Sequence, residues 1–270
     1  MIKEAIIPLA GLGTRLLPFS KIIPKELLPL GEKTILEHIL DECIDAGISK
    51  IILVISKKKE IIKKYFNKDN YLSKYLINKE DKLSLFKLKK LENYNKYIKY
   101  VYQNEPKGLG DAIFKCKKVI KNNFFLVILP DDVIIKYNCS KEIIQIHNRY
   151  KNSVIASKKV TNKEVSRYGM IKYLKINNNK IYISDLVEKP KKKISSSNFA
   201  IIGRYILPKT IFPIIKNTKK GKSSEVQITD AIKKLINKNN SFYGCIFKGS
   251  YLDCGTVKGY NKSINKFRIL

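Results

Sequence analysis

The stretch Ala5-Ile6-Ile7-Pro8-Leu9 leads directly into Ala10-Gly11-Leu12-Gly13-Thr14-Arg15, and Pro24-Lys25-Glu26-Leu27-Leu28-Pro29 follows after a short gap. The apolar run is typical of a buried strand. The two glycines after it allow backbone N–H groups to approach an anion closely. Arg15 and Lys25 add fixed positive charge to the same region. We therefore expect a loop that holds a triphosphate, placed directly after the first strand of a sheet.

Two better-known phosphate loops do not fit this chain. A dinucleotide-binding loop needs a third glycine three residues after Gly13, where this chain has Leu16. A P-loop needs a glycine five residues before Gly221-Lys222-Ser223, and that position is Lys216. The motif spacing therefore argues against an NAD-dependent dehydrogenase and against a P-loop NTPase.

Strand-like and helix-like segments alternate through the first half of the chain. This order is typical of an α/β fold with a mainly parallel sheet covered on both faces. Thr34 and Glu37 form a capping box that begins a helix, and Gly47 ends it. The expected strands are 5–9, 51–55, 98–102, 124–129, 154–157 and a hairpin of 171–176 with 181–187, and the other expected helices are 60–66, 109–121 and 141–150. The polar stretch 67–95 is expected to be an insertion outside the sheet.

Length and composition limit the class of protein. A chain of 270 residues with 44% hydrophobic residues can form one large α/β domain, residues 1–270, with its own core. The short linker-like stretch 191–198 is too short to divide domains. The amino terminus has no signal-peptide profile and no apolar run could cross a bilayer, so we expect a soluble, cytoplasmic protein without membrane contact.

Cysteine and histidine give no sign of a zinc or disulfide site. The five cysteines include no Cys-x-x-Cys pair, so we expect them to be small core residues. His38 and His147, the two histidines of the chain, have no Cys, His or acidic partner at metal-ligand spacing. We therefore expect neither histidine to be catalytic.

The formal net charge of +31 is typical of proteins that bind nucleic acid or a membrane surface. Here the lysines are spread along the chain together with abundant Ile, Asn and Tyr, which indicates biased genome composition rather than a partner. Clusters such as Lys57-Lys58-Lys59 and Lys191-Lys192-Lys193 are expected to be solvated faces. A basic nucleic-acid-binding module stays open as the alternative from a different class. Its nearest aromatic stripe, 94–102, is better explained as a strand.

Asp131 follows 124–129, the most apolar run of the chain. A carboxylate at such a position is costly to bury unless it binds a cation, and ligands of open parallel sheets lie at the carboxyl ends of the strands. Mg²⁺ is commonly held by one or two carboxylates plus substrate phosphates, so Asp253 is the best second ligand. Capping of a turn is the alternative for Asp131, and Asp132 is expected to be a turn residue.

Two other strand ends carry candidate substrate contacts. The amide of Gln103, with Gly108 and Gly110 nearby, could select a nucleotide base, and an ordinary strand–turn–helix connection explains the same residues equally well. Glu188 could accept hydrogen bonds from sugar hydroxyls while Lys189 binds a phosphate. A surface Glu–Lys pair is the alternative there.

Taken together, these motifs closely resemble the bacterial UTP–glucose-1-phosphate uridylyltransferases, a branch of the sugar-1-phosphate nucleotidyltransferases. The resemblance covers nearly the whole chain, and its motifs are 10–15, 24–29, 108–110, 128–131, 168–169, 187–190, 197–200, 203–205, 225–231 and 253–255. Pro24-Lys25-Glu26 and Asp253-Cys254-Gly255 favour the uridylyl branch. A thymidylyltransferase that acts on glucose 1-phosphate is the alternative within the family.

The resemblance implies a nucleotidyltransferase fold, a Rossmann-like three-layer sandwich, and the formation of UDP-glucose and pyrophosphate from UTP and glucose 1-phosphate. It implies Mg²⁺ on Asp131 and Asp253, nucleotide contacts from Ala10, Gly11, Gly13, Thr14, Gln103 and Gly108, catalytic roles for Arg15, Lys25 and Lys189, and sugar-phosphate contacts from Gly169, Glu188, Lys189, Asn198 and Gly203. It also implies a homo-oligomer, a dimer or a tetramer. The chain ends soon after the helix that follows Asp253, so we expect much of the usual carboxyl-terminal segment to be missing. Residues 222–224 depart from the family pattern and receive no role.

Overall fold

The computed structural model describes residues 1–190, 197–218, 225–238 and 241–269. Within them, nine strands form one sheet in the order β5-β4-β1-β6-β11-β8-β12-β10-β9. These strands are β1 Glu4–Pro8, β4 Lys50–Ile55, β5 Ile98–Tyr102, β6 Phe124–Ile128, β8 Ser153–Lys159, β9 Met170–Asn177, β10 Lys180–Val187, β11 Phe199–Pro208 and β12 Phe242–Ile246. Two small two-stranded sheets pair β2 Pro29–Leu30 with β3 Lys33–Thr34 and β7 Asp132–Ile135 with β13 Ser250–Asp253.

The large sheet is mixed. Strands β5, β4, β1 and β6 pair in parallel, as do β8 and β12. The antiparallel ladders of β11 with β6 and β8, and of β10 with β12 and β9, leave β10 and β11 opposite in direction to the other strands. The sheet is therefore mixed, and the expected parallel order holds for the half formed by β5, β4, β1 and β6.

Both faces of the sheet carry helices. Successive side chains of a strand point to opposite faces, and in β1 Ala5 and Ile7 belong to one core cluster while Ile6 belongs to the other. The first cluster includes residues of α1 Ile35–Asp45 and α6 Cys139–Tyr150, and the second includes residues of α5 Leu109–Lys115, α7 Ile211–Lys216 and α8 Ile228–Ile236. This arrangement leaves the strand ends free to position a site.

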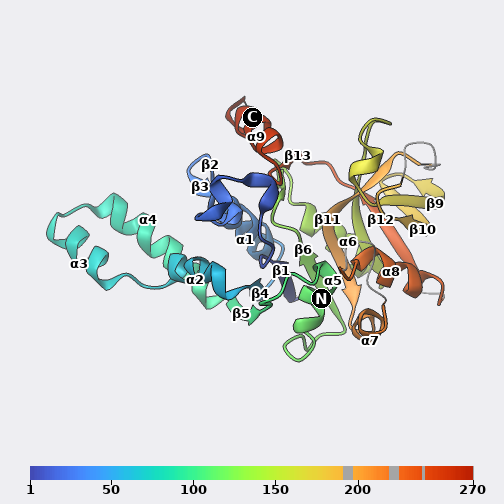
Figure 1. Ribbon diagram of the computed structural model, residues 1–270, viewed down its shortest axis with the longest axis horizontal. Coiled ribbons are helices and arrows are strands. Elements are labelled where there is room, and N and C mark those ends of the chain that lie inside the picture. Colours follow the sequence, from blue (N-terminus) through green and yellow to red (C-terminus); the bar gives the residue numbers. More distant parts are fainter. Residues whose placement is uncertain (191–196, 219–224, 239–240, 270) are drawn as a thin grey trace.

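The stretch 67–95 lies outside the sheet, as expected. After α2 Glu60–Phe66 it forms α3 Asn70–Asn78 and α4 Lys82–Glu92, two helices that extend away from the sheet in Figure 1. The following Tyr94 is 5% exposed, and its hydroxyl donates to Asp41 Oδ1 at 2.6 Å. Tyr94 therefore cannot offer its ring to a nucleic acid, whereas Tyr102, in the same stretch, is 38% exposed.

Most expected elements are present, with one clear correction. The helix expected over 109–121 ends at Lys115, and after the turns that follow it the carboxylate of Glu4 accepts the backbone N–H groups of Lys121 and Asn122, both at 2.8 Å. The chain is thereby directed into β6. Helix α9 Val257–Ile269 follows β13 and packs against it.

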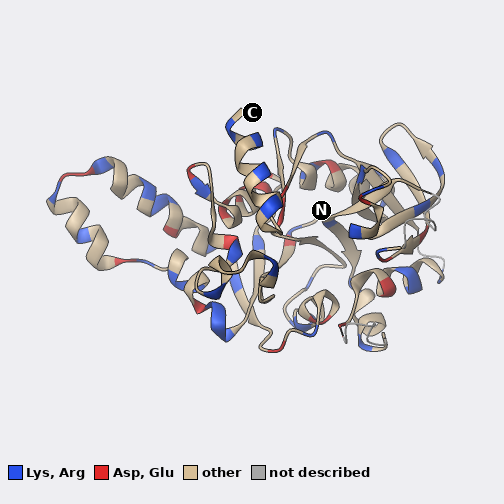
Figure 2. Ribbon diagram, turned by 45° about the horizontal axis from the view of Figure 1, so that its top comes forward, with Lys and Arg blue, Asp and Glu red and all other residues tan. Residues whose placement is uncertain are grey.

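The charged and sulfur-containing residues also differ in part from expectation. All five cysteines are buried and free, as expected. Lysines and arginines are spread over helices, strands and loops (Figure 2). However, Lys59 is 8% exposed rather than solvated, whereas Lys57 and Lys58 are exposed. The cluster 191–193 and most of the linker-like stretch 191–198 lie outside the described residues. Every helix in the described part of the chain is too short or too polar to cross a bilayer.

Candidate active site

A cleft of about 570 Å³ opens beside the ends of β1, β6 and β10. It brings together most of the residues singled out from the sequence: Ala10, Gly11, Arg15, Lys25, Gln103, Gly108, Asp131, Gly169, Glu188, Lys189, Gly203 and Asp253. Three others, Gly13, Thr14 and Asn198, do not line it. Segments far apart in the sequence therefore supply one site.

The glycine loop after β1 leaves room beside its backbone. A Cβ atom on Gly11 would meet no other atom within 4 Å, so a ligand can approach this part of the loop. Gly13 has a φ of 71°, a conformation that favours glycine, and it begins a short 3₁₀ helix, Thr14–Leu16. The hydroxyl of Ser20 donates to Gly13 O at 2.8 Å. Gly13 therefore shapes the loop, while Thr14 is exposed on its outer side.

The two cations of this region meet Asp131. Lys25 Nζ lies 2.7 Å and Arg15 Nη2 lies 3.7 Å from Asp131 Oδ2. Burial raises the pKa of the Asp131 carboxyl, but the charges of Lys25 and Arg15 outweigh this effect and lower the pKa below its ordinary value. Asp131 is therefore ionised at neutral pH, as a ligand for a cation must be.

Asp131 and Asp253 converge on Gly255. A Cβ atom there would lie 2.8 Å from Asp131 Oδ2 and 3.4 Å from Asp253 Oδ1, so only a glycine leaves this space between the two carboxylates. Their oxygens are the ligands that Mg²⁺ prefers, and two carboxylates leave the remaining positions for water and phosphate oxygens. In the described part of the chain, no cluster of three or more His, Cys, Asp or Glu side chains forms a complete metal cage. The donor set thus fits an ion shared with a phosphate-bearing substrate.

Asp132 is not the turn residue that was expected. It begins β7, where Tyr251 donates to its Oδ1 at 2.6 Å and the N–H of Gly203 donates to its Oδ2 at 2.9 Å. Burial and the neighbouring charge of Asp131 raise the pKa of Asp132 to about 6. A Cβ atom on Gly203 would lie 2.5 Å from the Cβ of Leu129, so this glycine is required for close packing of β11 beside the site.

The expected base-binding residues lie at the end of β5. Gln103 is 5% exposed, and its Nε2 donates to Gly108 O at 3.2 Å and to Asp111 Oδ2 at 2.7 Å. Gly108 has a φ of 92°, and a Cβ atom there would lie 2.8 Å from the Cβ of Glu225. The close contact with Glu225 thus explains why residue 108 is a glycine. The amide nitrogen of Gln103 is already used, so its amide oxygen is the atom that could accept a hydrogen bond from a base.

The expected sugar side lies beyond the end of β10. A Cβ atom on Gly169 would lie 3.2 Å from Glu188 Oε2, and the hydroxyl of Thr229 donates to the same oxygen at 2.9 Å. Lys189 Nζ lies 3.7 Å from Glu188 Oε1, and the side chain of Lys189 is 62% exposed. Asn198 stands before β11, where its backbone carbonyl accepts from the N–H of Val160. Glu188 and Gly169 are therefore adjacent.

Sequence reasoning missed several residues of the cleft. Arg167 Nη2 lies 2.8 Å from Asp253 Oδ2, and Glu26, Thr229 and Tyr251 also line the cleft. Arg167 directly precedes Tyr168-Gly169, one of the motifs of the resemblance, and this position is the one sequence feature that could have indicated a place for Arg167 in the cleft.

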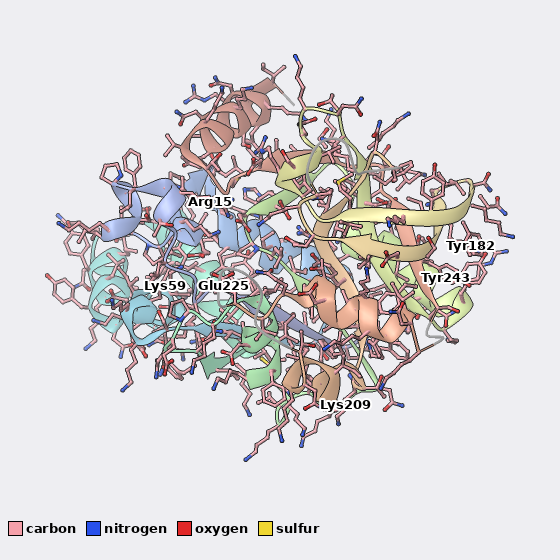
Figure 3. All side chains as sticks on the ribbon, turned by 45° about the vertical axis from the view of Figure 1, so that its right-hand side comes forward. Arg15, Lys59, Tyr182, Lys209, Glu225 and Tyr243 are labelled. Carbon is pink, nitrogen blue, oxygen red and sulfur yellow. The ribbon has the colours of Figure 1, made fainter. Side chains whose placement is uncertain are left out.

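A second hollow of about 530 Å³ lies between α6 and the turn from β9 to β10. Its described lining includes a single carboxylate, Glu142, and no glycine loop. Lys180, on its border, lies over the rings of Tyr150, Tyr182 and Tyr243. Tyr182 and Tyr243 lie far from Arg15 in Figure 3. The cleft at Asp131 is thus the better candidate for an active site.

The comparisons with known proteins show the family of the chain. The model of the nucleotidyl transferase family matches residues 4–268. The chain belongs to this family. The UTP–glucose-1-phosphate uridylyltransferase of Pseudomonas aeruginosa is 35% identical over 272 residues, which cover 98% of this chain and 95% of that protein. This coverage is at odds with the expectation that much of the carboxyl-terminal segment is missing.

One further relative and two solved structures are also similar to this chain. A putative UTP–glucose-1-phosphate uridylyltransferase of Methanocaldococcus jannaschii is 36% identical, with 97% of this chain and 92% of that protein covered. A structure of UDP-glucose pyrophosphorylase complexed with UDP-glucose has a TM-score of 0.88 and 36% identity, covering 100% of this chain and 99% of that one. The UTP-bound enzyme of Acinetobacter baumannii has a TM-score of 0.86 and 32% identity, with 99% and 93% covered.

Proposed function

We propose that this nucleotidyl transferase transfers the uridylyl group of UTP to glucose 1-phosphate, giving UDP-glucose and pyrophosphate. One observation carries the proposal: a single cleft holds the cation-bearing glycine loop, the carboxylates Asp131 and Asp253, and the Glu188–Lys189 pair. The relatives named above, which match along nearly their whole length, support the choice of UTP and glucose 1-phosphate.

The reaction is an in-line displacement at phosphorus. A phosphate oxygen of glucose 1-phosphate attacks the α-phosphorus of UTP and forms the new P–O bond, while the bond between the α-phosphorus and the bridging oxygen breaks and releases pyrophosphate. A phosphate monoester dianion is already a competent nucleophile, so no side chain has to remove a proton. Catalysis then consists of alignment and of stabilising the negative charge of the transition state.

The cleft offers a cation for each part of this task. Arg15 and Lys25 lie beside the glycine loop, where they would hold the triphosphate and stabilise the leaving pyrophosphate. Lys189, largely exposed next to Glu188, would bind the phosphate of the sugar substrate. Glu188 and the backbone at Gly169 would hold the glucose hydroxyls.

We propose that Asp131 and Asp253 hold Mg²⁺. When bound, the ion neutralises charge on the reacting phosphates and fixes their orientation. The ammonium of Lys25 donates to Asp131 Oδ2, and its charge would keep this carboxylate ionised and correctly placed for the ion.

The remaining parts of the proposal follow the resemblance. Gln103, Gly108, Ala10 and Gly11 would receive the uracil, although Gly108 also has the packing contact with Glu225 described above. The two core clusters support a three-layer arrangement in a single nucleotidyltransferase domain. A homo-oligomer and a cytoplasmic location stay predictions.

The test is pyrophosphate release from purified protein with glucose 1-phosphate and Mg²⁺, measured in parallel with UTP, TTP, ATP and GTP. We expect release with UTP to exceed release with each other nucleotide. A preference for TTP would instead indicate a thymidylyltransferase. No release by folded protein with any nucleotide would overturn the proposal.

A further inference from the structure

Arg167 joins the expected sugar side of the cleft to the expected metal side. It ends the 3₁₀ helix Val165–Arg167 and directly precedes Tyr168-Gly169, so its backbone belongs to the loop beside Glu188. Its guanidinium nevertheless reaches Asp253, with Nη2 lying 2.8 Å from Oδ2. The Arg167 guanidinium also lies 5.6 Å from the centre of the Tyr168 ring. One side chain thus spans from the sugar loop to a carboxylate of the metal site.

The contact occupies one of the two oxygens through which Asp253 could bind a metal ion. Oδ1 of Asp253 accepts the N–H of Gly255 at 3.0 Å, whereas Oδ2 is held by Arg167. A cation that binds Asp253 through Oδ2 must therefore compete with the guanidinium. The side chain of Arg167 is 51% exposed, so it has solvent space into which it can turn.

The sugar phosphate has to pass through the same place. In the proposed reaction its phosphate lies between the sugar, held beside Gly169 and Glu188, and the ion held by Asp131 and Asp253. The backbone of Arg167 lies beside the sugar side of the cleft, and its guanidinium lies beside Asp253 on the metal side. A guanidinium released from Asp253 would thus already lie beside an anion for which its paired N–H donors are well suited.

We propose that Arg167 is the resident counter-ion of Asp253 in the substrate-free protein and becomes a ligand of the sugar phosphate when a divalent ion takes Asp253. The proposal rests on the proposed function for the identity of the phosphate. Removal of the Arg167 side chain should therefore increase the affinity for the divalent ion and decrease the affinity for the sugar phosphate.

The test compares Arg167→Gln with a matched control. Lys233 pairs with Asp185 at 3.1 Å, with side-chain exposures of 45% and 24%, and Arg167 pairs with Asp253 at exposures of 51% and 24%. Lys233 does not line the cleft. Lys233→Gln therefore removes one positive charge and one ion pair of similar exposure outside the site.

The first readout is Mn²⁺ binding to the substrate-free protein, followed by the electron paramagnetic resonance signal of free Mn²⁺. We expect Arg167→Gln to bind Mn²⁺ about two- to fivefold more tightly than wild type, because an exposed ion pair of this kind contributes little and its loss removes a competitor. Lys233→Gln should change the Mn²⁺ affinity by less than that. An affinity of Arg167→Gln that is unchanged or weaker would overturn the role as counter-ion.

The second readout is steady-state kinetics. We expect the KM for glucose 1-phosphate to rise about tenfold or more in Arg167→Gln, as for the loss of a charged hydrogen bond, while the KM for UTP changes less. Arg167→Lys, which keeps the charge without the planar fork, should recover part of the loss. An unchanged KM for glucose 1-phosphate in an active variant would overturn the transfer to phosphate. Because the Mn²⁺ measurement needs no turnover, a failure of the proposed function would show instead as an inactive wild-type protein with the Mn²⁺ difference intact.

Discussion

Lys59 and Glu26 form a buried ion pair, with Lys59 Nζ lying 3.0 and 2.8 Å from the two carboxylate oxygens of Glu26. The same ammonium donates to Leu9 O at 2.6 Å. One side chain therefore ties the residue before the glycine loop to the loop that carries Lys25. Figure 3 marks Lys59 and Arg15.

This contact predicts a positioning role for Lys59 in UTP binding. We expect Lys59→Met to raise the KM for UTP about two- to tenfold, because the residue before the glycine loop loses its tie to the loop that carries Lys25, with a smaller change in the KM for glucose 1-phosphate. The melting temperature should also fall, since Glu26 then stays buried without its partner. Lys58→Met, which removes the exposed neighbouring lysine, is the control and should leave both constants near wild type. Equal changes in both KM values for Lys59→Met would contradict a specific effect on the UTP side.

The assignment of Asp131 predicts a loss of turnover without a loss of fold. Asp131→Asn should lower kcat by about 100-fold or more, because the amide is a poor ligand for the divalent ion and for Lys25. Thermal unfolding should show a native-like transition. Asp45→Asn, at the end of α1, controls for the loss of a carboxylate elsewhere. Near-normal kcat in Asp131→Asn would exclude this residue as the metal ligand.

The buried ion pair of Arg204 and Glu42 predicts a large effect on stability. Arg204 is fully buried, with Nη2 lying 2.6 Å from Glu42 Oε2, and its Nη1 also donates to Leu129 O, two residues before Asp131. Arg204→Met should lower the free energy of unfolding by about 3–5 kcal/mol, because Glu42 stays buried without its partner. Arg204→Met combined with Glu42→Leu should lose less, as measured by urea denaturation. A single variant within 1 kcal/mol of wild type would refute this account.

His147 predicts a pH dependence of stability. Its Nδ1 lies 2.8 Å from Asn152 O, and burial lowers its pKa below the ordinary 6.5. Since the folded pKa is below the unfolded one, the stabilising contribution is complete above about pH 6.5 and is lost as the pH falls through the folded pKa. His147→Asn keeps a donor but cannot titrate. The melting temperature of the variant minus that of wild type should thus increase as the pH is lowered from 7.5 to 5.5. A difference that stays constant with pH would contradict the prediction.

Two glycines of the cleft predict opposite sensitivities to alanine. Gly108→Ala combines a φ of 92° with a contact of 2.8 Å and should lose about 1–3 kcal/mol of stability. Gly11→Ala meets no atom within 4 Å and should leave stability within about 0.5 kcal/mol of wild type. Thermal unfolding checks both variants, and equal losses would show that the space beside Gly11 is not open.

Local features of the fold were predictable because the interacting residues are close in the chain. The capping box of Thr34 and Glu37 is present, with the N–H of Glu37 donating to Thr34 Oγ1 at 3.3 Å and the N–H of Thr34 donating to Glu37 Oε2 at 2.8 Å. The strand 98–102 agrees with β5 in both bounds. The end of α5 was missed, because the carboxylate that directs the chain beyond it belongs to Glu4, more than a hundred residues away.

The sequence by itself determined the family, the position of the glycine loop, and the carboxylates at the strand ends, since these motifs are short and carry their chemistry in adjacent residues. The tertiary structure alone decided which charges meet. Lys59 belongs to a lysine cluster typical of a solvated face, yet its ammonium is buried against Glu26, 33 positions earlier. Arg167 pairs with Asp253, 86 positions later. A charge pattern along the chain predicts exposure on average, whereas the partner of one ion depends on which strand ends the folded sheet places side by side.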